Sequence, residues 1–467
     1  MRGKKFWLPL TILAVVLAAH LALTGAAPAW AQYVNGPKLT IVNKSGYPAS
    51  QTYLVFLART RFNLDGSTNT GKYHHIIWPH EEFLPAFPAI DPVDNTKQIN
   101  GILYAEYWVT LDKLSKDADG NYYFYVPRAE SDIVPADKQG IYSGRLWLSF
   151  QTPFYPHVTD AFTYSQPNFG NETDPNYATV LDFYEVAIDA TTFKVTGDTT
   201  NVDNVTMPLV HDLKNSGVRL PGSPMGLDMP LAKIRQAFGA DPNFKKLVTP
   251  QRIYAPGHGI EMSLFPADYY TNYINKCWKL WAENTLSIKV DNIWWSGTVD
   301  TSTQKLKLSG TVDGATEDHY IDWPPSKDIF LCDGVFNGVP APTPEHPVPT
   351  AAFLRDKDIK NRIASALNRT VMHLAPYADP AHPTAEPWSY PESYYQGVFL
   401  DPADYQTNVY AKILHGLAID GSCYAYAYDD NDGKSTTISG QADEIILTIN
   451  NCQNVITPVT SFLLLDQ

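Results

Sequence analysis

Two acidic residues, Glu185 and Asp203, stand in a segment whose pattern could place both carboxyl groups on one surface. Residues 181–209 read as two strands joined by a turn, and side chains alternate between the two faces of a strand. The same-face neighbours would be Leu181, Phe183, Ala187 and Asp189 for Glu185, and Asn201, Val205 and Met207 for Asp203. With a turn centred near Lys194, and the Gly197-Asp198 pair taken as a turn signal, the two acids come opposite or nearly opposite each other.

Two carboxyl groups on a rigid sheet suit the cleavage of a glycosidic bond. One acid must be protonated to donate to the leaving oxygen, and the other must be ionised to activate water or attack carbon. Apolar surroundings and a nearby negative charge both raise the pKa of a carboxyl group, which helps one member of a pair to keep its proton. The alternative is that both acids are solvated charges on a strand face, and the pattern alone does not exclude it.

The residues around both acids resemble the catalytic region of one family of glycosidases. The segments DFYEV (182–186) and TTNVDNVTMPL (199–209) are similar to those of glycoside hydrolase family sixty-four, the laminaripentaose-producing type of β-1,3-glucanase. In that family the Glu of the first segment is the general acid, and the Asp of the second is the general base of an inverting reaction. The resemblance therefore implies these roles for Glu185 and Asp203.

Three further residues are substrate-binding candidates. Thr200, three residues before Asp203, matches a family position that lines the sugar site. Ala187 and Asp189 stand where the family has polar Thr and Asn, and we include Asp189 among the candidates. Arg145 lies in a Ser-Gly-Arg sequence similar to a strand entry of the family, and it could support a sugar hydroxyl or the acidic site. A surface arginine without such a role is the alternative.

Other segments resemble the family in the same order and extend to the far end of the chain. They are RIYAPG (252–257), FPADYYTNYINKCW (265–278), DIFLCDGVF (328–336), ALNRT (366–370) and DGSCYAYAYDDNDG (420–433). The last also resembles thaumatin-like proteins, whose β-barrel the family is held to share. The resemblance implies a mainly β protein, in which a thaumatin-like β-barrel or sandwich domain and a mixed α/β domain flank a wide substrate groove.

The periodicity of the chain agrees with such a division. Runs of β-rich residues predict strands at 39–43, 52–58, 101–111, 122–126 and 144–150. Helical spacing predicts helices at 227–239, 270–281, 358–369 and 405–415, with strands at 286–299 and 304–312 and closing strands at 424–428 and 444–450. We therefore expect a β domain over 32–215 that is closed by 420–455, a mixed α/β domain over 216–419, and a C-terminal tail at 456–467.

Residues 1–31 have the form of a secretory signal peptide. Basic residues at positions 2, 4 and 5 precede an apolar run from 6 to 23, and Ala29-Trp30-Ala31 offers the small residues that a signal peptidase reads. A retained membrane anchor is the alternative, since the apolar run is almost long enough to span a bilayer. The Ala-x-Ala ending favours cleavage between Ala31 and Gln32. This predicts secretion to the extracellular space or the periplasm, with no membrane contact afterwards.

Four cysteines in an exported protein suggest two disulfides, for which three pairings exist. Cys423 and Cys452 flank an expected hairpin near the C-terminus, so we expect them to pair. In the family, the Cys of the F-x-C-x-G segment usually has a partner just before A-L-N-R, where this chain has Ile363-Ala364-Ser365. Cys332 must therefore pair with Cys277 or stay free, and we expect the Cys277–Cys332 bond.

Charge and motifs argue against several other classes of protein. The net charge of -14 does not fit a nucleic-acid-binding protein, which would show a basic stripe. The sequence has no H-E-x-x-H or paired-Cys pattern, no P-loop, no G-x-S-x-G and no dinucleotide fingerprint. His74 and His75 are adjacent on a predicted strand and point to opposite faces, so that with His80 they make a poor chelating set. We expect neither a metal nor a cofactor.

The expected partner is a β-1,3-glucan polysaccharide. Aromatic residues supply 13% of the chain, and flat rings with polar edges suit the faces of sugars. The resemblance implies an endo-acting enzyme that inverts the anomeric centre and releases short oligosaccharides such as laminaripentaose; the residues alone leave retention and inversion open. We expect the protein to be a monomer. The alternative is a thaumatin-like glucan-binding protein without catalysis, against which the presence of both acids in their motifs counts.

Overall fold

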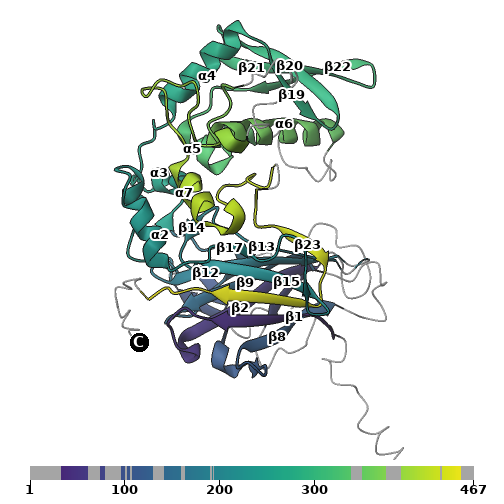
Figure 1. Ribbon diagram of the computed structural model, residues 1–467, viewed down its shortest axis with the longest axis vertical. Coiled ribbons are helices and arrows are strands. Elements are labelled where there is room, and N and C mark those ends of the chain that lie inside the picture. The colour runs from purple at the N-terminus through teal and green to yellow at the C-terminus, as the bar shows by residue number, and fades with distance from the viewer. Residues whose placement is uncertain are drawn as a thin grey trace, which may run out of the picture.

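The computed structural model describes residues 33–60, 74–78, 96–99, 102–105, 108–129, 141–158, 164–189, 192, 194–337, 350–374, 391–431 and 434–453. The expected signal peptide, the C-terminal tail and His80 lie outside these residues. Within them the protein is mainly β, as expected, and its described α-helices all follow residue 230 (Figure 1). None of the described helices combines the length and the apolar character needed to cross a bilayer.

Two sheets make up the β part of the fold, and each contains segments from both ends of the chain. The first has the order β16 (Val218–Arg219), β15 (Leu209–Asn215), β24 (Glu444–Ile449), β1 (Tyr33–Asn43), β8 (Tyr122–Ala129) and β7 (Ser115–Lys116), with β17 (Met225–Gly226) beside β15. The second has the order β23 (Ile438–Gln441), β13 (Lys194–Thr199), β12 (Val180–Ile188), β9 (Ile141–Phe150), β2 (Thr52–Thr60) and β3 (His74–Trp78), with β6 (Val109–Thr110) beside β2. In the described part of the chain no strand pairing joins the two sheets, so the expected barrel is not closed.

Apolar side chains from both sheets meet in one core. Alternate residues of β1, β9, β12 and β24 are buried there, as the two-residue period of a strand requires. On β12, Tyr184 and Val186 face this core, whereas Phe183 and Glu185 occupy the opposite face. Phe183 belongs to a second, smaller apolar cluster, whose other buried members are Val55, Trp147, Phe154 and Leu181. Glu185 therefore lies next to this outer cluster and not in the main core.

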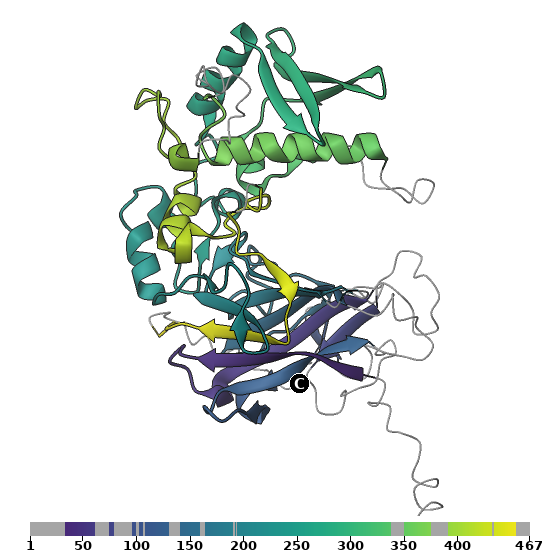
Figure 2. The ribbon, with the colours of Figure 1, turned by 45° about the vertical axis from the view of Figure 1, so that its right-hand side comes forward.

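A smaller sheet and two helices form the opposite end of the molecule (Figure 2). The sheet is antiparallel, with the order β19 (Leu286–Val290), β20 (Ile293–Asp300), β21 (Lys305–Val312) and β22 (Ala315–Ile321), and the helices are α4 (Thr271–Glu283) and α6 (Ala351–Asn368). The expected apolar stripe of α4 is buried in the core through Tyr273, Cys277 and Trp281. Helix α6 begins where the Thr350 side chain accepts a hydrogen bond from Phe353 N at 3.1 Å.

Short elements connect the two ends of the molecule (Figure 1). They are α2 (Leu231–Phe238), α3 (Pro256–Glu261), α5 (Ser326–Leu331), α7 (Val409–Leu417), and the paired strands β14 (Asn204–Val205) and β18 (Ile253–Tyr254). A separate small sheet contains β11 (Tyr164–Ser165), β10 (His157–Val158), β5 (Ile102–Ala105) and β4 (Thr96–Ile99). The helices predicted around 227–239 and 405–415 correspond to α2 and α7, although each is shorter than predicted.

Residues 424–428 contain no strand but an irregular stretch that leads into a turn, so the strand predicted there is wrong, whereas the predicted strand at 444–450 corresponds to β24. The backbone N–H groups of Tyr428 and Asp429 both donate to Tyr426 O, at 3.0 Å each. Asp429 Oδ2 also accepts a hydrogen bond from Ala425 N at 2.9 Å. These local bonds use the backbone groups that a strand would offer to a neighbour.

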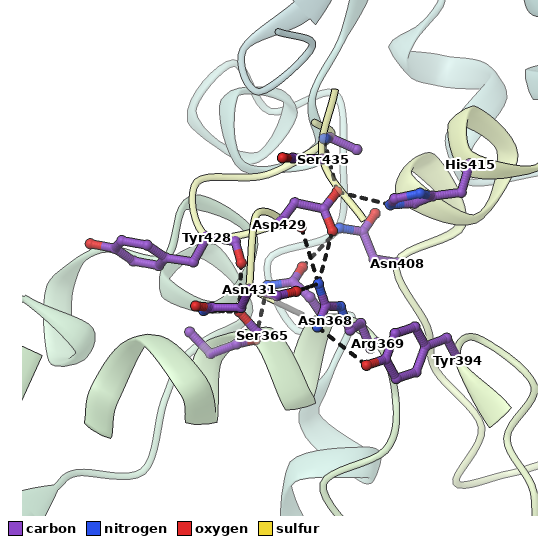
Figure 3. Close-up of polar contacts among 12 residues, drawn as sticks. Ser365, Asn368, Arg369, Tyr394, Asn408, His415, Tyr428, Asp429, Asn431 and Ser435 are labelled. Atoms are coloured by element: carbon purple, nitrogen blue, oxygen red, sulfur yellow. Dashed lines mark hydrogen bonds and ion pairs between the residues drawn. The ribbon is translucent and has the colours of Figure 1, made fainter. Parts of the chain in front are cut away.

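Asp429 also joins this segment to α6 and α7, as Figure 3 shows. Arg369 Nη2 donates to Asp429 Oδ1 at 3.4 Å and to Asn431 O at 2.7 Å, and His415 Nε2 lies 2.9 Å from Asp429 Oδ2. Burial alone would raise the pKa of Asp429, but the neighbouring His415 and Arg369 outweigh it and hold the pKa below its ordinary value. The carboxylate is fully buried. The segments ALNRT and DGSCYAYAYDDNDG thus meet in a structural ion-pair network.

Both expected disulfides are absent, because all four cysteines are free and buried. Each thiol lies among different groups: Cys423 Sγ is 3.4 Å from Asn201 Oδ1, and Cys452 Sγ is 3.0 Å from its neighbour's carbonyl, Asn450 O. Cys332 accepts a hydrogen bond from Asn368 Nδ2 at 3.6 Å, whereas Cys277 lies in α4 beside Tyr273. The pairing prediction is wrong because 423 does not begin a hairpin strand that would end at 452.

Candidate active site

The hairpin that carries Glu185 has a different register from the expected one. Strands β12 and β13 pair antiparallel with Glu185 opposite Asp198, not opposite Asp203. The Gly197-Asp198 pair, expected as a turn, is part of β13 and faces β12. The predicted pairing of Glu185 with Asp203 is therefore wrong.

The turn forms earlier than predicted, at residues 189–194, and one expected substrate-binding residue builds it. Asp189 Oδ1 accepts hydrogen bonds from the Thr192 N–H at 2.7 Å and from the Thr192 hydroxyl at 2.8 Å. This turn brings Lys194 back into the sheet and sets the register of everything that follows. A role for Asp189 toward substrate stays a prediction, since the structure places it beyond the end of β12 and not beside Glu185.

Arg145 faces Glu185 across the β9 and β12 strand pair. Its Nε donates to Glu185 Oε1 at 2.7 Å, and the two side chains are 31% and 26% exposed. The guanidinium also stacks over the Phe183 ring, with 4.5 Å between Cζ and the ring centroid. The structure thus links Arg145 to the acidic site, in a position where solvent or a substrate reaches both side chains.

Asp203 lies in the turn between β13 and β14, and residues far along the chain position it. Strand β14 pairs with β18 through Asn204 opposite Tyr254, and the Ala255 N–H donates to Asp203 O at 3.0 Å. Thr200, the other expected substrate-binding residue, is buried, and its Oγ1 accepts a hydrogen bond from the backbone of residue 202 at 3.3 Å. Thr200 therefore shapes the turn that carries Asp203.

Asp182, in the DFYEV segment, ties the strand of Glu185 to the chain that follows Asp203. Its buried Oδ2 accepts hydrogen bonds from the backbone N–H groups of Thr206 and Met207, at 3.2 Å each, and from the Thr206 hydroxyl at 3.1 Å. Burial raises the pKa of Asp182 to about 7, against the opposing effect of these hydrogen bonds. This anchor holds the two candidate catalytic segments in one relative position.

Gln166 connects the two candidate catalytic acids. With its amide oriented to satisfy both neighbours, its nitrogen donates to Asp203 Oδ2 at 3.2 Å and its oxygen accepts from Arg145 Nη1. A chain of contacts therefore runs from Glu185 through Arg145 and Gln166 to Asp203. The carboxylates of Glu185 and Asp203 share one region of the surface, with two side chains between them.

Helix α3 supplies a histidine to Asp203. His258 Nε2 lies 3.1 Å from Asp203 Oδ1, and His258 Nδ1 lies 2.9 Å from Glu261 Oε2. Lys327 Nζ completes the series at 2.8 Å from Glu261 Oε1. Burial alone would lower the pKa of His258, but the hydrogen bonds to Asp203 and Glu261 and their charges outweigh it, so the pKa is raised. A protonated His258 places a positive charge next to the Asp203 carboxylate.

A pocket of about 680 Å³ opens beside Asp203. Gln166 and His258 contribute polar groups to its wall, and Phe169, Tyr177 and Tyr254 contribute aromatic rings. Rings that present an apolar face and a polar edge are suited to sugar units. The pocket therefore provides room for a polar ligand next to one of the two acids.

Three residues of this region, Asp198, Gln166 and His258, were not among the candidates from sequence. His258 directly follows the RIYAPG segment, and Asp198 directly precedes TTNVD, so the neighbouring motifs offered a signal for both. Gln166 carries no such signal, because only tertiary contacts bring its amide between Arg145 and Asp203.

A search for metal ligands among the described residues finds no group of three or more His, Cys, Asp or Glu side chains arranged around a common point. His74 and His75 belong to β3.

Two carboxyl groups in one region of the surface, one of them beside a pocket with aromatic walls, define a site of the glycosidase class. Comparison of the sequence with protein families gives the particular family: residues 134–449 match the family model of β-1,3-glucanases, glycoside hydrolase family sixty-four. The chain belongs to this family and is a glycoside hydrolase.

Solved structures share the fold. A β-1,3-glucanase domain of the same family from Clostridium beijerinckii is 23% identical, with a TM-score of 0.64 over 90% of this chain and 98% of that chain. A laminaripentaose-producing β-1,3-glucanase in complex with laminaritetraose is 20% identical, with a TM-score of 0.64 over 90% and 99% of the two chains. A laminaripentaose-producing enzyme from Paenibacillus barengoltzii is 21% identical, with a TM-score of 0.53 over 89% and 75%. A search of curated proteins finds no match.

Proposed function

We propose that the protein is a secreted, monomeric endo-β-1,3-glucanase that hydrolyses its substrate with inversion. Glu185 is the general acid in this proposal, and Asp203 is the general base. Family membership supports the substrate class, and the motif positions of both acids support their roles. The sequence of residues 1–31 supports secretion. The likeness of residues 420–433 to thaumatin-like proteins supports a thaumatin-like origin of the β part.

The observation that carries the mechanism is the chain of contacts from Glu185 to Asp203. Retaining enzymes hold their two carboxyl groups roughly 5 to 5.5 Å apart, whereas inverting enzymes separate them by roughly 6.5 to 9.5 Å to admit a water. Here Arg145 and Gln166 stand between the two carboxylates, which favours the wider spacing.

In the proposed reaction, Glu185 protonates the leaving glycosidic oxygen while Asp203 removes a proton from the attacking water. The new bond to the anomeric carbon forms as the old one breaks, without a covalent enzyme intermediate. A protonated His258 places positive charge beside the Asp203 carboxylate before the reaction. Thr200, Asp189 and Arg145 remain proposed as substrate-binding residues.

Short oligosaccharides are the proposed products. Solved relatives are described as laminaripentaose-producing, and one is in complex with laminaritetraose. An oligosaccharide of this length would extend beyond the pocket beside Asp203, into the wide substrate groove that the family resemblance implies. Product length is measured by chromatography of laminarin or curdlan digests.

Substitution of the two acids tests their roles. Glu185→Gln and Asp203→Asn should each lower the release of reducing sugar from laminarin by about two to four orders of magnitude, the usual effect of removing a general acid or base. Circular dichroism and thermal unfolding check that both variants fold. Asp318→Asn, on β22 of the smaller sheet, is the matched control and should keep wild-type turnover. Near-normal turnover in either folded acid variant would contradict its assigned role.

The same wild-type digest also reports the stereochemistry. Proton NMR of the first product formed should show an α-anomer at the new reducing end, since inversion of a β-linkage gives the α configuration. An initial β-anomer would mean retention. No release of reducing sugar by the wild-type protein would instead favour a glucan-binding protein without catalysis.

A further inference from the structure

Asp198 lies directly opposite Glu185 in the β12 and β13 pair, so both side chains point to the same face of the sheet. The sequence motifs assign Asp198 no role, and the reaction described above does not use it. Its Oδ1 is buried and has no hydrogen-bond partner among the described residues. Glu185 keeps 26% of its side chain exposed, and Asp198 as a whole is half-buried. A substrate therefore reaches Glu185, whereas the Oδ1 atom of Asp198 is withdrawn from it.

Glu185 and Asp198 are opposite each other within reach of a side-chain hydrogen bond, which adds to the effects that raise the pKa of Asp198. A carboxylate has no donor, so a hydrogen bond between two carboxyl groups requires one proton between them. Arg145 Nε donates to Glu185 Oε1 at 2.7 Å, so this oxygen of Glu185 already has a positively charged donor in the resting protein. The shared proton is then held on the Asp198 side of the pair.

The charged groups around Asp198 agree with this assignment. Burial raises the pKa of Asp198 well above its ordinary value, and the negative charge of Glu185 adds to the effect. Arg145, which lies on β9, lowers the pKa of Asp198 through its positive charge. Asp430, which lies in the segment after Tyr424, raises the pKa through its negative charge. Tyr424 faces the same acids, and its own pKa is raised by burial and by the charges of Asp430, Asp198 and Glu185.

We propose that Asp198 holds the proton that Glu185 delivers to the leaving glycosidic oxygen. This rests on the proposed role of Glu185 as the general acid and resolves a conflict within it, because a carboxylate paired with arginine has no proton to give. Asp198 is a positioning residue in this account: it touches Glu185 and not the substrate.

One proton moves from Asp198 through Glu185 to the glycosidic oxygen in each turnover. The O–H bond of Asp198 breaks, its electrons stay on the Asp198 carboxylate, and a new O–H bond forms on Glu185. Glu185 then gives this proton to the glycosidic oxygen as the bond from that oxygen to the anomeric carbon breaks, with the bonding electrons leaving on the oxygen. Asp203 takes one proton from the attacking water and releases it to solvent, and solvent returns one proton to the pair of Asp198 and Glu185.

Asp198→Asn tests the proposal, because asparagine keeps the size of the side chain and a donor toward Glu185 but has no carboxyl proton to transfer. Turnover of laminarin near neutral pH should fall about 10²-fold, the lower end of the usual effect of general acid catalysis. Hydrolysis of a 2,4-dinitrophenyl glycoside of a β-1,3-glucan oligosaccharide should stay within about threefold of wild type, since this leaving group departs as a stable anion and needs no acid. The alkaline limb of kcat against pH on laminarin should also move to lower pH.

The variants Glu185→Gln and Asp318→Asn are measured together with Asp198→Asn, and Asp318→Asn again serves as the control. Wild-type laminarin turnover in Asp198→Asn, together with an inactive Glu185→Gln, would contradict proton sharing and leave the proposed function standing. Equal losses on laminarin and on the dinitrophenyl substrate in a folded Asp198→Asn would show a purely structural role and also overturn the proposal. Normal turnover of laminarin by Glu185→Gln would instead overturn the proposed function.

Discussion

Glu185 has a charged neighbour where the sequence pattern predicts apolar ones. The expected same-face residue Phe183 is present in its outer cluster, but the Arg145 guanidinium lies over that ring and bonds to Glu185. Alternation along one strand identifies neighbours on that strand only. Arg145 belongs to the adjacent strand β9, and its contact depends on the register between the two strands. The local sequence of a strand residue therefore identifies only some of the groups that contact it.

At the same scale, His258 should give the protein a measurable dependence of stability on pH. Its folded-state pKa lies above the ordinary value of 6.5, because the pairing with Asp203 and Glu261 outweighs burial. The stabilisation from these contacts is therefore fully present below about pH 6.5, where the unfolded state is protonated too, and is lost as the pH rises through the folded-state pKa. The contribution is roughly 0.5 to 1 kcal/mol, since solvent screens a partly exposed group.

Urea unfolding of the wild type and of His258→Gln measures this contribution. The difference in unfolding free energy should be largest near about pH 5.5 and should shrink by about pH 8.5. Taking the difference between the two proteins removes the effect of other titrating groups. A difference that grows with rising pH would show that His258 is not stabilised in its charged form.

At the scale of elements, the longer helices and many of the strands follow from periodicity, whereas the placement of Asp203 does not. Strand β14 is two residues long and exists because it pairs with β18, about fifty residues later in the chain. The DFYEV segment has a second function here, since Asp182 anchors the chain after Asp203. A motif read as catalytic thus contains one residue that positions the catalytic loop.

The contacts of Asp429 should make a large contribution to the packing of α6 and α7. Asp429→Asn would leave the Arg369 guanidinium buried without its counter-charge, and breaking one side of a buried ion pair costs about 3 to 5 kcal/mol. Chemical denaturation should therefore show a clearly lower free energy of unfolding. The control is Asp322→Asn, which breaks the exposed Lys305–Asp322 pair and should cost only roughly 0 to 1 kcal/mol. Equal effects of the two substitutions would contradict a structural role of the network.

At the scale of the whole molecule, the first and the last described strands meet in one sheet. Strand β24 runs parallel to β1 and antiparallel to β15, so the first and last described strands are adjacent. Long-range pairing of this kind closes the β part without a covalent link. It explains how the fold holds together although all four thiols are free.

The whole chain should therefore contain four reduced, unreactive thiols. All four cysteines are buried, and burial raises the pKa of each thiol, to about 12 in the case of Cys277. A buried thiol with a raised pKa reacts slowly, since the thiolate is the reactive form. Titration with dithionitrobenzoate should label almost no thiol in the native protein and all four after unfolding without reductant. Two or fewer labelled thiols after unfolding would indicate a disulfide.

The sequence by itself determined the mainly β character, the helices, the two acids and the family to which they belong. These depend on the periodicity of nearby residues and on motifs that are contiguous in the chain, both of which are visible without a fold. The tertiary structure alone decided the register, in which the turn at 189–194 brings Asp198 and not Asp203 opposite Glu185. It also decided the contact of His258 with Asp203 and the free state of the cysteines. A strand can pair in several registers with similar local energies, and only the turn it closes and the core it buries select one.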